Sequence, residues 1–163
     1  MKILFMMLCL INFLDNDSLE KEVSKNQMTV SWEHKEERIH FKMTAPTSGW
    51  VTIGFNTTAS MSGAYLLMGR MVNGKAELVE HYTISPGNYK PITSLGANAA
   101  VQNVNGSESN KQTTIQFSLP VEGTNKYARQ LKSGSEYAMT LAYSREDDFQ
   151  HHSMMRTSVN VKL

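Results

Sequence analysis

Two polar loops in the sequence contain side chains that are suited to bind a metal ion. Met61 ends one loop, just before an apolar stretch that starts at Ala64. His151 and His152 lie in the other loop, shortly before the last apolar stretch of the chain. Thioether groups favour Cu(I), and imidazole suits copper, iron and zinc. The sequence thus pairs a loop methionine with a loop histidine, each next to a predicted strand.

Motifs for other chemistries are absent or poorly placed. The sequence has no glycine-rich dinucleotide or phosphate loop, no H-E-x-x-H motif and no G-x-S-x-G motif. Asp147 and Asp148 are adjacent carboxylates, but adjacent side chains of a strand point to opposite faces and make a poor acid–base pair. We therefore expect that the protein is not an enzyme in its own right.

The N-terminus has the pattern of an export signal. Lys2 precedes an apolar run over residues 3–14, and polar residues 15–18 follow. This is typical of a secretory signal, and the run is shorter than the roughly 20 residues that span a bilayer. We expect residues 1–17 to direct the chain to a secreted or periplasmic location. Lipid attachment at Cys9 is an alternative, which Leu8 disfavours because a small residue is expected there; an N-terminal core element is another.

Composition narrows the possible functions further. Cys9 is the sole cysteine, so a chain without residues 1–17 has none. Disulfides, thiolate metal sites, iron–sulfur clusters and covalent haem attachment are then excluded. The 163 residues suit one domain, and a net charge of +1 with scattered Lys and Arg provides no basic face for nucleic acid. We expect no transmembrane span in the mature chain.

Alternation of apolar and polar residues predicts strands through most of the chain. Residues 28–32 and 39–43 alternate in this way, which indicates an antiparallel hairpin with one solvent-exposed face. Asn73-Gly74 is a strong hairpin-turn signal between two further runs. The other predicted strands cover residues 50–55, 64–72, 76–84, 99–104, 113–119, 137–144 and 158–163.

Many short strands separated by turn residues favour an all-β fold, with an antiparallel β-sandwich or barrel. We expect a linker at residues 18–26 and one β domain at residues 27–163. The polar residues 120–135 contain at most a short helical turn near 126–131. Asn105-Gly106 is interpreted as part of a turn. Asn56-Thr57-Thr58 and Asn105-Gly106-Ser107 also match the N-glycosylation sequon.

The stretches around the two loops resemble the DOMON family. Residues 49–55 (GWVTIGF) and 61–69 (MSGAYLLMG) are similar to its pattern of a Gly-Trp strand, a polar loop, Met-x-Gly-Ala and an apolar strand. His152, followed four residues later by Arg156-Thr157 and a final strand, is similar to its C-terminal histidine. The resemblance covers roughly residues 27–163. It implies an immunoglobulin-like sandwich of two antiparallel sheets that holds haem b or a sugar.

The resemblance also implies a set of iron ligands. In haem-binding members, such as the cytochrome domain of cellobiose dehydrogenase, one Met and one His bind the iron. Carried over to this sequence, the pair is Met61 and His152, with His151 as the alternative histidine. Tyr65 departs from the family pattern, which often has an acidic residue there.

Other residues would complete such a haem site. Leu66 and Met68 share one face of their predicted strand and would line an apolar slot. Trp50 or Phe55 would pack on the edge of the ring. Arg156 would pair with a propionate, because the guanidinium group suits carboxylates.

The sequence therefore predicts an exported, non-covalent haem b-binding domain that serves in electron transfer or in redox or ligand sensing. One alternative is a haem-free module for a carbohydrate or another small ligand, in which Tyr82 and Tyr89 would stack on a sugar ring. Another is a copper-binding protein that uses His151, His152 and nearby methionines. Electron transfer would require a separate redox partner protein.

Overall fold

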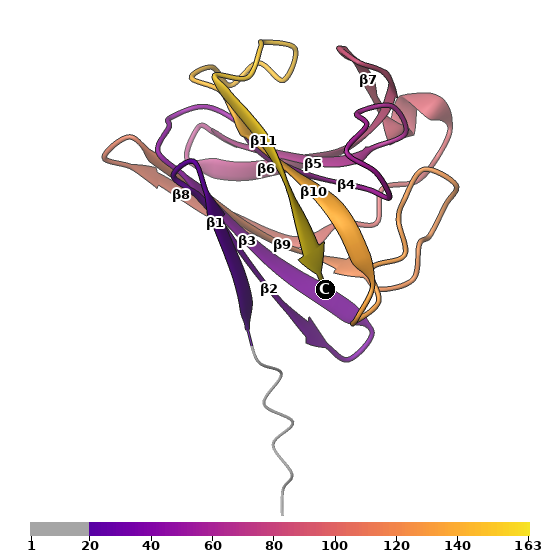
Figure 1. The fold of residues 1–163 in the computed structure, drawn as a ribbon. Helices are drawn as coiled ribbons and strands as arrows, with labels where there is room; N and C mark the ends of the chain where they lie inside the picture. Colours follow the sequence, from indigo (N-terminus) through magenta and orange to yellow (C-terminus); the bar gives the residue numbers. More distant parts are fainter. Residues whose placement is uncertain (1–19) are drawn as a thin grey trace, which may run out of the picture.

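The computed structural model describes residues 20–163, which form a two-layer sandwich of antiparallel sheets (Figure 1). The N-terminal segment expected to be an export signal, and Cys9 with it, lie outside the described residues. One sheet has five strands in the order β1-β2-β3-β9-β8, and the other has six in the order β11-β10-β4-β5-β6-β7. The all-β sandwich expected from the sequence is confirmed.

The strands alternate between inward and outward side chains, and the inward ones form the core. In chain order the strands are β1 Lys21–Lys25, β2 Met28–Lys35, β3 Arg38–Ala45, β4 Val51–Asn56, β5 Tyr65–Val72, β6 Lys75–Ser85, β7 Asn88–Pro91, β8 Gln102–Ser109, β9 Gln112–Pro120, β10 Glu136–Tyr143 and β11 Met155–Lys162. A short 3-10 helix, Ile92–Leu95, follows β7. Phe41 lies at the centre of the core, with its ring centroid 5.5 Å from those of Phe55 and Phe117.

Turn chemistry explains two of the hairpins. Asn73 and Gly74 both have positive φ, 51° and 75°, and they join β5 to β6 as the Asn-Gly signal predicts. Asn110 and Lys111, with φ of 51° and 59°, make the equivalent turn between β8 and β9. Asn105-Gly106 is not a turn, because it lies inside β8 and pairs with Gln116 and Ile115. The prediction of a turn there was wrong.

The structure differs from the sequence prediction in three other segments. Lys21–Lys25, expected to belong to a linker, forms the edge strand β1. The segment after β6, where no strand was predicted between residues 84 and 99, forms β7 and the 3-10 helix. The helical turn expected near residues 126–131 is instead a turn in which the Asn125 side-chain carbonyl accepts hydrogen bonds from the Tyr127 and Ala128 amides.

Tyr65, the residue that departs from the family pattern, points into the sandwich. Its hydroxyl donates a hydrogen bond of 2.5 Å to Glu80, whose other carboxylate oxygen accepts from the amides of Ala100 and Val101. Burial, and then the neighbouring Glu80 carboxylate, raise the pKa of Tyr65. The pair connects β5 and β6 to the segment that leads into β8, so it has a structural role.

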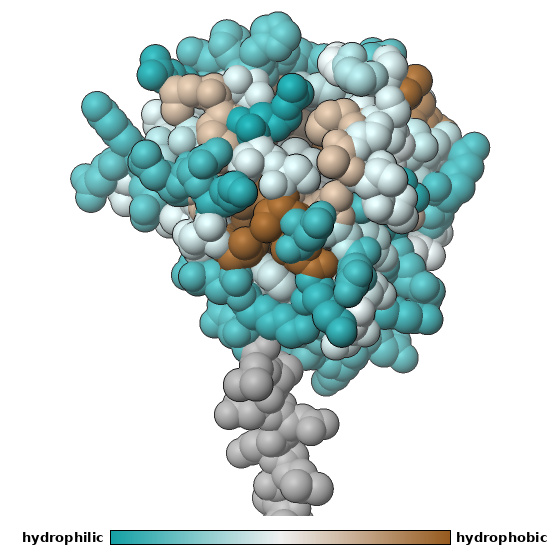
Figure 2. Space-filling view, viewed as in Figure 1, coloured by the Kyte–Doolittle hydropathy of each residue, from teal (hydrophilic) through white to brown (hydrophobic). Residues whose placement is uncertain are grey.

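The edge strands β1 and β11 lie next to each other on one side of the sandwich (Figure 1). Figure 2 shows a hydrophobic patch in this region, surrounded by hydrophilic residues. Val23, Trp32 and Val161 line a shallow concavity here. Lys21 and Lys162 flank it, and such charges protect exposed strand edges from pairing with other chains.

Candidate functional site

The outer face of the six-stranded sheet carries a second apolar cluster, separate from the sandwich core. An outer face is normally hydrophilic, since it contacts water. Here six side chains are buried against one another on the outer face. They come from β5, from β10 and from the segments next to these strands. The buried members are Trp50, Ala64, Leu66, Met68, Ala142 and Phe149. Apolar side chains gathered on this face indicate a binding site, because they are not needed for packing between the sheets.

A cavity of about 110 Å³ lies over this cluster. Its floor is the sheet, and its walls are the loop before β5, the loop between β10 and β11, and the hairpin of β6 and β7; these segments rise above the sheet in Figure 1. The structure brings most of the sequence-predicted site residues to this one cavity. They are Trp50, Met61, Leu66, Met68, His151, His152 and Arg156.

Phe55 is the predicted site residue that the structure does not bring to the cavity. It is fully buried in the sandwich core, with its ring 5.5 Å from Phe41 and 5.7 Å from Tyr137 between centroids. Phe55 is five positions after Trp50, an odd offset, so their side chains leave the backbone on opposite faces of the sheet. Of the two aromatic candidates, only Trp50 can contact a group in the cavity.

The Met61 thioether lies over the floor of the cavity. Its sulfur is 3.9 Å from the hydroxyl of Thr140, which is on the outer face of β10. The backbone carbonyl of Met61 accepts a hydrogen bond of 3.1 Å from Ala64, and Gly63 donates one of 2.8 Å to Thr83 on β6. The loop is therefore closed down onto the sheet, with the sulfur on its inner side.

The two histidines lie on the facing loop, and both side chains are exposed at the mouth of the cavity. The hydroxyl of the buried Ser144 donates a hydrogen bond of 3.1 Å to the carbonyl of His152. The amide of His151 donates one of 2.9 Å to the carbonyl of Asp148. These bonds hold the backbone of both residues and leave the imidazoles available to a ligand.

Phe149 anchors the histidine loop to the sheet. The Arg70 guanidinium lies 4.4 Å above its ring centroid, and the ring of His81 is 5.7 Å away in an edge-to-face contact. The hydroxyl of Tyr89 donates a hydrogen bond to the Phe149 carbonyl. Arg70 also donates to the carbonyl of Asp147, at 2.8 Å. Strands β5, β6 and β7 thus all contribute to the position of this loop.

His81 is a buried side chain next to the residues that anchor the histidine loop. It is 2% exposed, and its Nδ1 lies 3.1 Å from the carbonyl oxygen of Val79, a contact in which a neutral ring donates. Burial lowers the pKa of His81 below its ordinary value of 6.5, and the bond to Val79 opposes this shift. Its role is to pack against Tyr89 and Phe149, and it is not among the residues that line the cavity.

Two residues that line the cavity each have a buried side-chain polar atom without a hydrogen-bond partner among residues 20–163. These atoms are the indole Nε1 of Trp50 and the hydroxyl of Thr83. An unsatisfied buried polar group costs about 1–3 kcal/mol, so such groups call for an explanation. A bound molecule with polar atoms would supply the missing partners.

Sequence reasoning missed the residues that support the site, namely Asn56, Arg70, His81, Thr83, Ser144 and Phe149. For Phe149 a signal was present, since a large apolar residue inside a polar loop needs a place to pack. For Ser144 and Asn56 the sequence carries no such signal, because their partners are backbone carbonyls of the folded loops.

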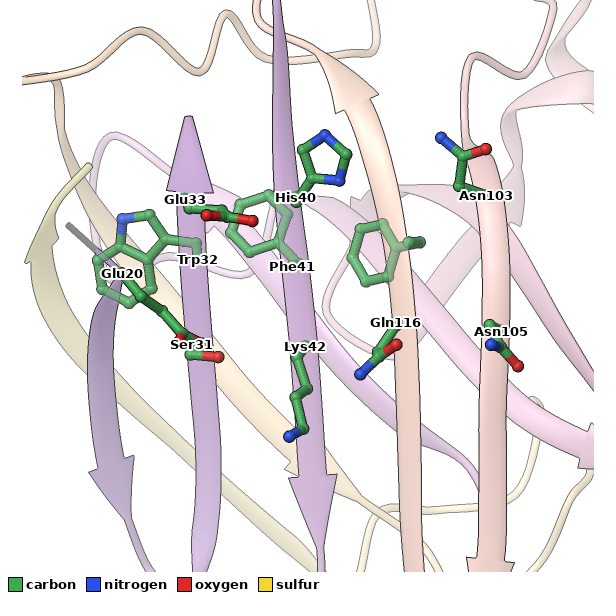
Figure 3. A pocket seen from close by; sticks show the side chains of 11 residues that line it. Glu20, Ser31, Trp32, Glu33, His40, Phe41, Lys42, Asn103, Asn105 and Gln116 are labelled. Atoms are coloured by element: carbon green, nitrogen blue, oxygen red, sulfur yellow. The ribbon is translucent and has the colours of Figure 1, made fainter. Parts of the chain in front are cut away.

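A larger concavity, of about 350 Å³, lies on the outer face of the five-stranded sheet (Figure 3). The side chains of Glu33, His40, Lys42 and Gln116 project from this face. No thioether lines it, and its apolar residues, Trp32, Phe41 and Phe117, belong to the sandwich core. We interpret it as the solvent-exposed face that the alternating pattern of the first hairpin predicts.

Two findings concern the described part of the chain as a whole. Within residues 20–163, no three His, Cys, Asp or Glu side chains are grouped so that they could hold a metal ion, so a metal in the cavity would need a ligand of another type, such as Met61. In the same range, no helix has the length and apolar character needed to cross a membrane.

Comparison with solved structures finds similar folds among cytochrome domains. The cytochrome b domain of pyranose dehydrogenase from Coprinopsis cinerea matches with a TM-score of 0.61 and 10% identity, over 83% of this chain and 76% of that one. The cytochrome domain of Myriococcum thermophilum cellobiose dehydrogenase matches with a TM-score of 0.62 and 9% identity, over 88% and 81% respectively. At these identities the likeness shows the fold alone.

Comparison of the sequence with family models gives a direct assignment. The model of the DOMON domain matches residues 24–144, which include the Gly-Trp strand, the Met61 loop and the apolar strand β5. The match ends before the loop that carries His151 and His152. Because it covers well over half of the chain, this protein belongs to the DOMON family.

Proposed function

We propose that this DOMON domain binds haem b without a covalent bond and serves in electron transfer or redox sensing. The observation that carries the proposal is that the Met61 thioether and the imidazoles of His151 and His152 line one cavity that has an apolar floor. Two solved structures of similar fold are cytochrome domains, which is consistent with this function. Thioether and imidazole are a recognised axial pair for haem iron.

The residues present fit haem in their chemistry. Met61 and His152 would be the axial ligands, with His151 as the alternative to His152. Trp50, Leu66 and Met68 would contact the ring and exclude water, and the Arg156 guanidinium would pair with a propionate. The unpartnered Nε1 of Trp50 and hydroxyl of Thr83 suit a ligand that has polar groups as well as an apolar surface.

The small volume of the cavity means that haem could bind only after a movement of the chain. Sites for small molecules and cofactors usually measure about 300–1,000 Å³, whereas this cavity measures about 110 Å³. A group as large as a porphyrin can enter only if the histidine loop moves away from the Met61 loop. The histidine loop is held by Phe149 and by the hydrogen bond from Ser144, and neither residue is part of the sandwich core, so movement of this loop does not require the core to open.

The bound haem would supply one-electron redox chemistry. If Met61 and His152 both held the iron, no position would be left for oxygen, which would favour electron transfer over oxygen activation. Coordination by Met favours the reduced iron and raises the reduction potential. We infer no catalytic activity for the domain itself. We also infer that residues 1–17 direct export to a secreted or periplasmic location, and that electrons pass to or from a separate protein partner.

The carbohydrate alternative has weaker support from the site. Of the two tyrosines that could stack on a sugar, Tyr89 lines the cavity, but its hydroxyl is bonded to the Phe149 carbonyl. Tyr82 packs against Tyr127, with the ring centroids 5.1 Å apart, and is not among the residues that line the cavity.

The proposal is tested by adding haem to the purified protein and recording its absorption spectrum. We expect one haem per chain and a low-spin, six-coordinate spectrum in both oxidation states. Met61→Leu should bind haem but give a five-coordinate spectrum. The matched control is Met71→Leu, because Met71 packs against the sandwich core. Failure of the wild-type protein to bind stoichiometric haem would rule out the proposal.

A further inference from the structure

Asn56 is the last residue of β4 and lies beneath the Met61 loop. Its side-chain amide nitrogen donates hydrogen bonds to the carbonyls of Ser60, at 2.6 Å, and Ser62, at 3.0 Å. Its carbonyl oxygen accepts a bond of 2.9 Å from the Thr57 amide. The residue is only 7% exposed. All the hydrogen-bonding groups of this side chain are therefore used inside the loop.

The two donated bonds reach the residues on either side of Met61. They fix the Ser60–Met61 and Ser62–Gly63 peptide groups, and the Met61 carbonyl is itself bonded to the Ala64 amide. The backbone on both sides of the methionine is therefore held, and so is the direction in which its side chain leaves. A carboxylate at this position could not form these bonds, because it has no hydrogen to donate. A shorter side chain could not reach both carbonyls at once. Asn is thus the residue type that this geometry requires.

We propose that Asn56 is a positioning residue that holds the Met61 thioether over the cavity floor. Its relevance to iron coordination rests on the proposed haem function, but its effect on the loop does not. Without the two bonds, the Met61 loop would open and the sulfur would leave the contact with Thr140. The same contacts occupy the amide nitrogen of the sequon Asn56-Thr57-Thr58, so this sequon is not available for glycosylation in the folded protein.

The first test uses the protein without haem and measures the exposure of the Met61 sulfur. Hydrogen peroxide oxidises exposed methionines to sulfoxides, which peptide mass spectrometry can quantify. In Asn56→Asp, which is nearly isosteric, we expect the oxidation rate of Met61 to rise about tenfold, as the loss of two hydrogen bonds would allow. Met154, which is 46% exposed, is the internal reference and should oxidise at the same rate in every variant.

The control is Asn105→Asp, which makes the same chemical change on an exposed residue of β8, in the other sheet. Asn56→Ser, which adds no charge, is measured in parallel, so a folding defect caused by a buried carboxylate does not decide the result. An unchanged oxidation rate of Met61 in folded Asn56→Ser would overturn the proposal.

The second test uses the haem-loaded protein. Asn56→Asp and Asn56→Ser should convert part of the low-spin, six-coordinate signal to a five-coordinate one and lower the reduction potential, while Asn105→Asp should leave both unchanged. If the wild-type protein does not bind haem, the proposed function fails, and the oxidation test still decides the role of Asn56. If haem binds and the Asn56 variants keep the wild-type spectrum and potential, the positioning role is wrong.

Discussion

At the scale of single residues, the site depends on polar side chains that hold loop backbone. Asn56 binds two carbonyls next to Met61, and Ser144 binds the carbonyl of His152. Each lies at the end of a strand of the same sheet, where a short side chain can reach the loop that follows. His81 acts differently, since it supports Phe149 and Tyr89 by packing rather than by hydrogen bonds.

The burial of His81 predicts a loss of stability in acid. Its pKa in the folded protein lies below the ordinary value of 6.5, so the unfolded chain binds a proton more readily than the folded one. The free energy of unfolding should therefore fall as the pH drops below 6.5, by at most roughly 1.4 kcal/mol per pH unit for one group. Above pH 6.5 the effect should vanish.

Replacement of His81 by Phe removes the titrating group and keeps a ring of similar size. Urea unfolding of the haem-free protein between pH 5 and pH 7.5 should show a smaller loss of stability for this variant than for the wild type. His40→Phe, on the outer face of the other sheet, is the control. Equal pH dependence of wild type and His81→Phe would show that His81 does not titrate in this way.

At the scale of elements, two loops and one hairpin surround the cavity, and each is attached to the sheet by specific contacts. The loop after β10 depends on Phe149, which packs against Arg70 and His81 and accepts a hydrogen bond from Tyr89 through its carbonyl. The start of the same loop lies so close to Gly49 that a Cβ there would be 2.5 Å from the carbonyl carbon of Arg145. This contact explains why glycine precedes Trp50.

Phe149→Ala should release the histidine loop. Removal of a buried phenylalanine ring typically costs about 3–5 kcal/mol, and the lower end is expected here because the site is near the surface. The melting temperature should fall, and hydrogen exchange of residues 146–153 should accelerate. Haem affinity should decrease as well, because the position of His152 is less well defined. Met154→Ala, an exposed site in the same loop, should change none of these; wild-type exchange rates in Phe149→Ala would contradict the anchor role.

At the scale of the whole molecule, alternation of side chains predicted most of the sandwich, because the inward residues of β2, β3, β9 and β10 are apolar at every second position. It could not predict β1, whose sequence KEVSK has a single apolar residue and is exposed along most of its length. Its pairing with β2 comes from backbone hydrogen bonds, which leave no pattern in the side chains.

Most residues of the candidate site could also be named from the sequence, and the errors have physical causes. Met61, His151, His152 and Arg156 could be named, and they meet at one cavity although Met61 is far from the other three in the sequence. Phe55 was assigned wrongly to the cavity, because its separation from Trp50 places it on the inner face. The turn between β8 and β9 was predicted at Asn105-Gly106, which is a strong local turn signal. The long-range pairing of β8 with β9 instead places the turn at Asn110-Lys111.

The central claim is that one thioether and one imidazole from opposite loops bind the same haem iron. The most direct measurement is the electron paramagnetic resonance spectrum of the oxidised, haem-loaded protein, compared among wild type, Met61→Leu, His151→Ala and His152→Ala. We expect a low-spin signal in wild type and His151→Ala, and its replacement by a high-spin signal in Met61→Leu and in His152→Ala. A low-spin signal that survives both Met61→Leu and His152→Ala would contradict the claim.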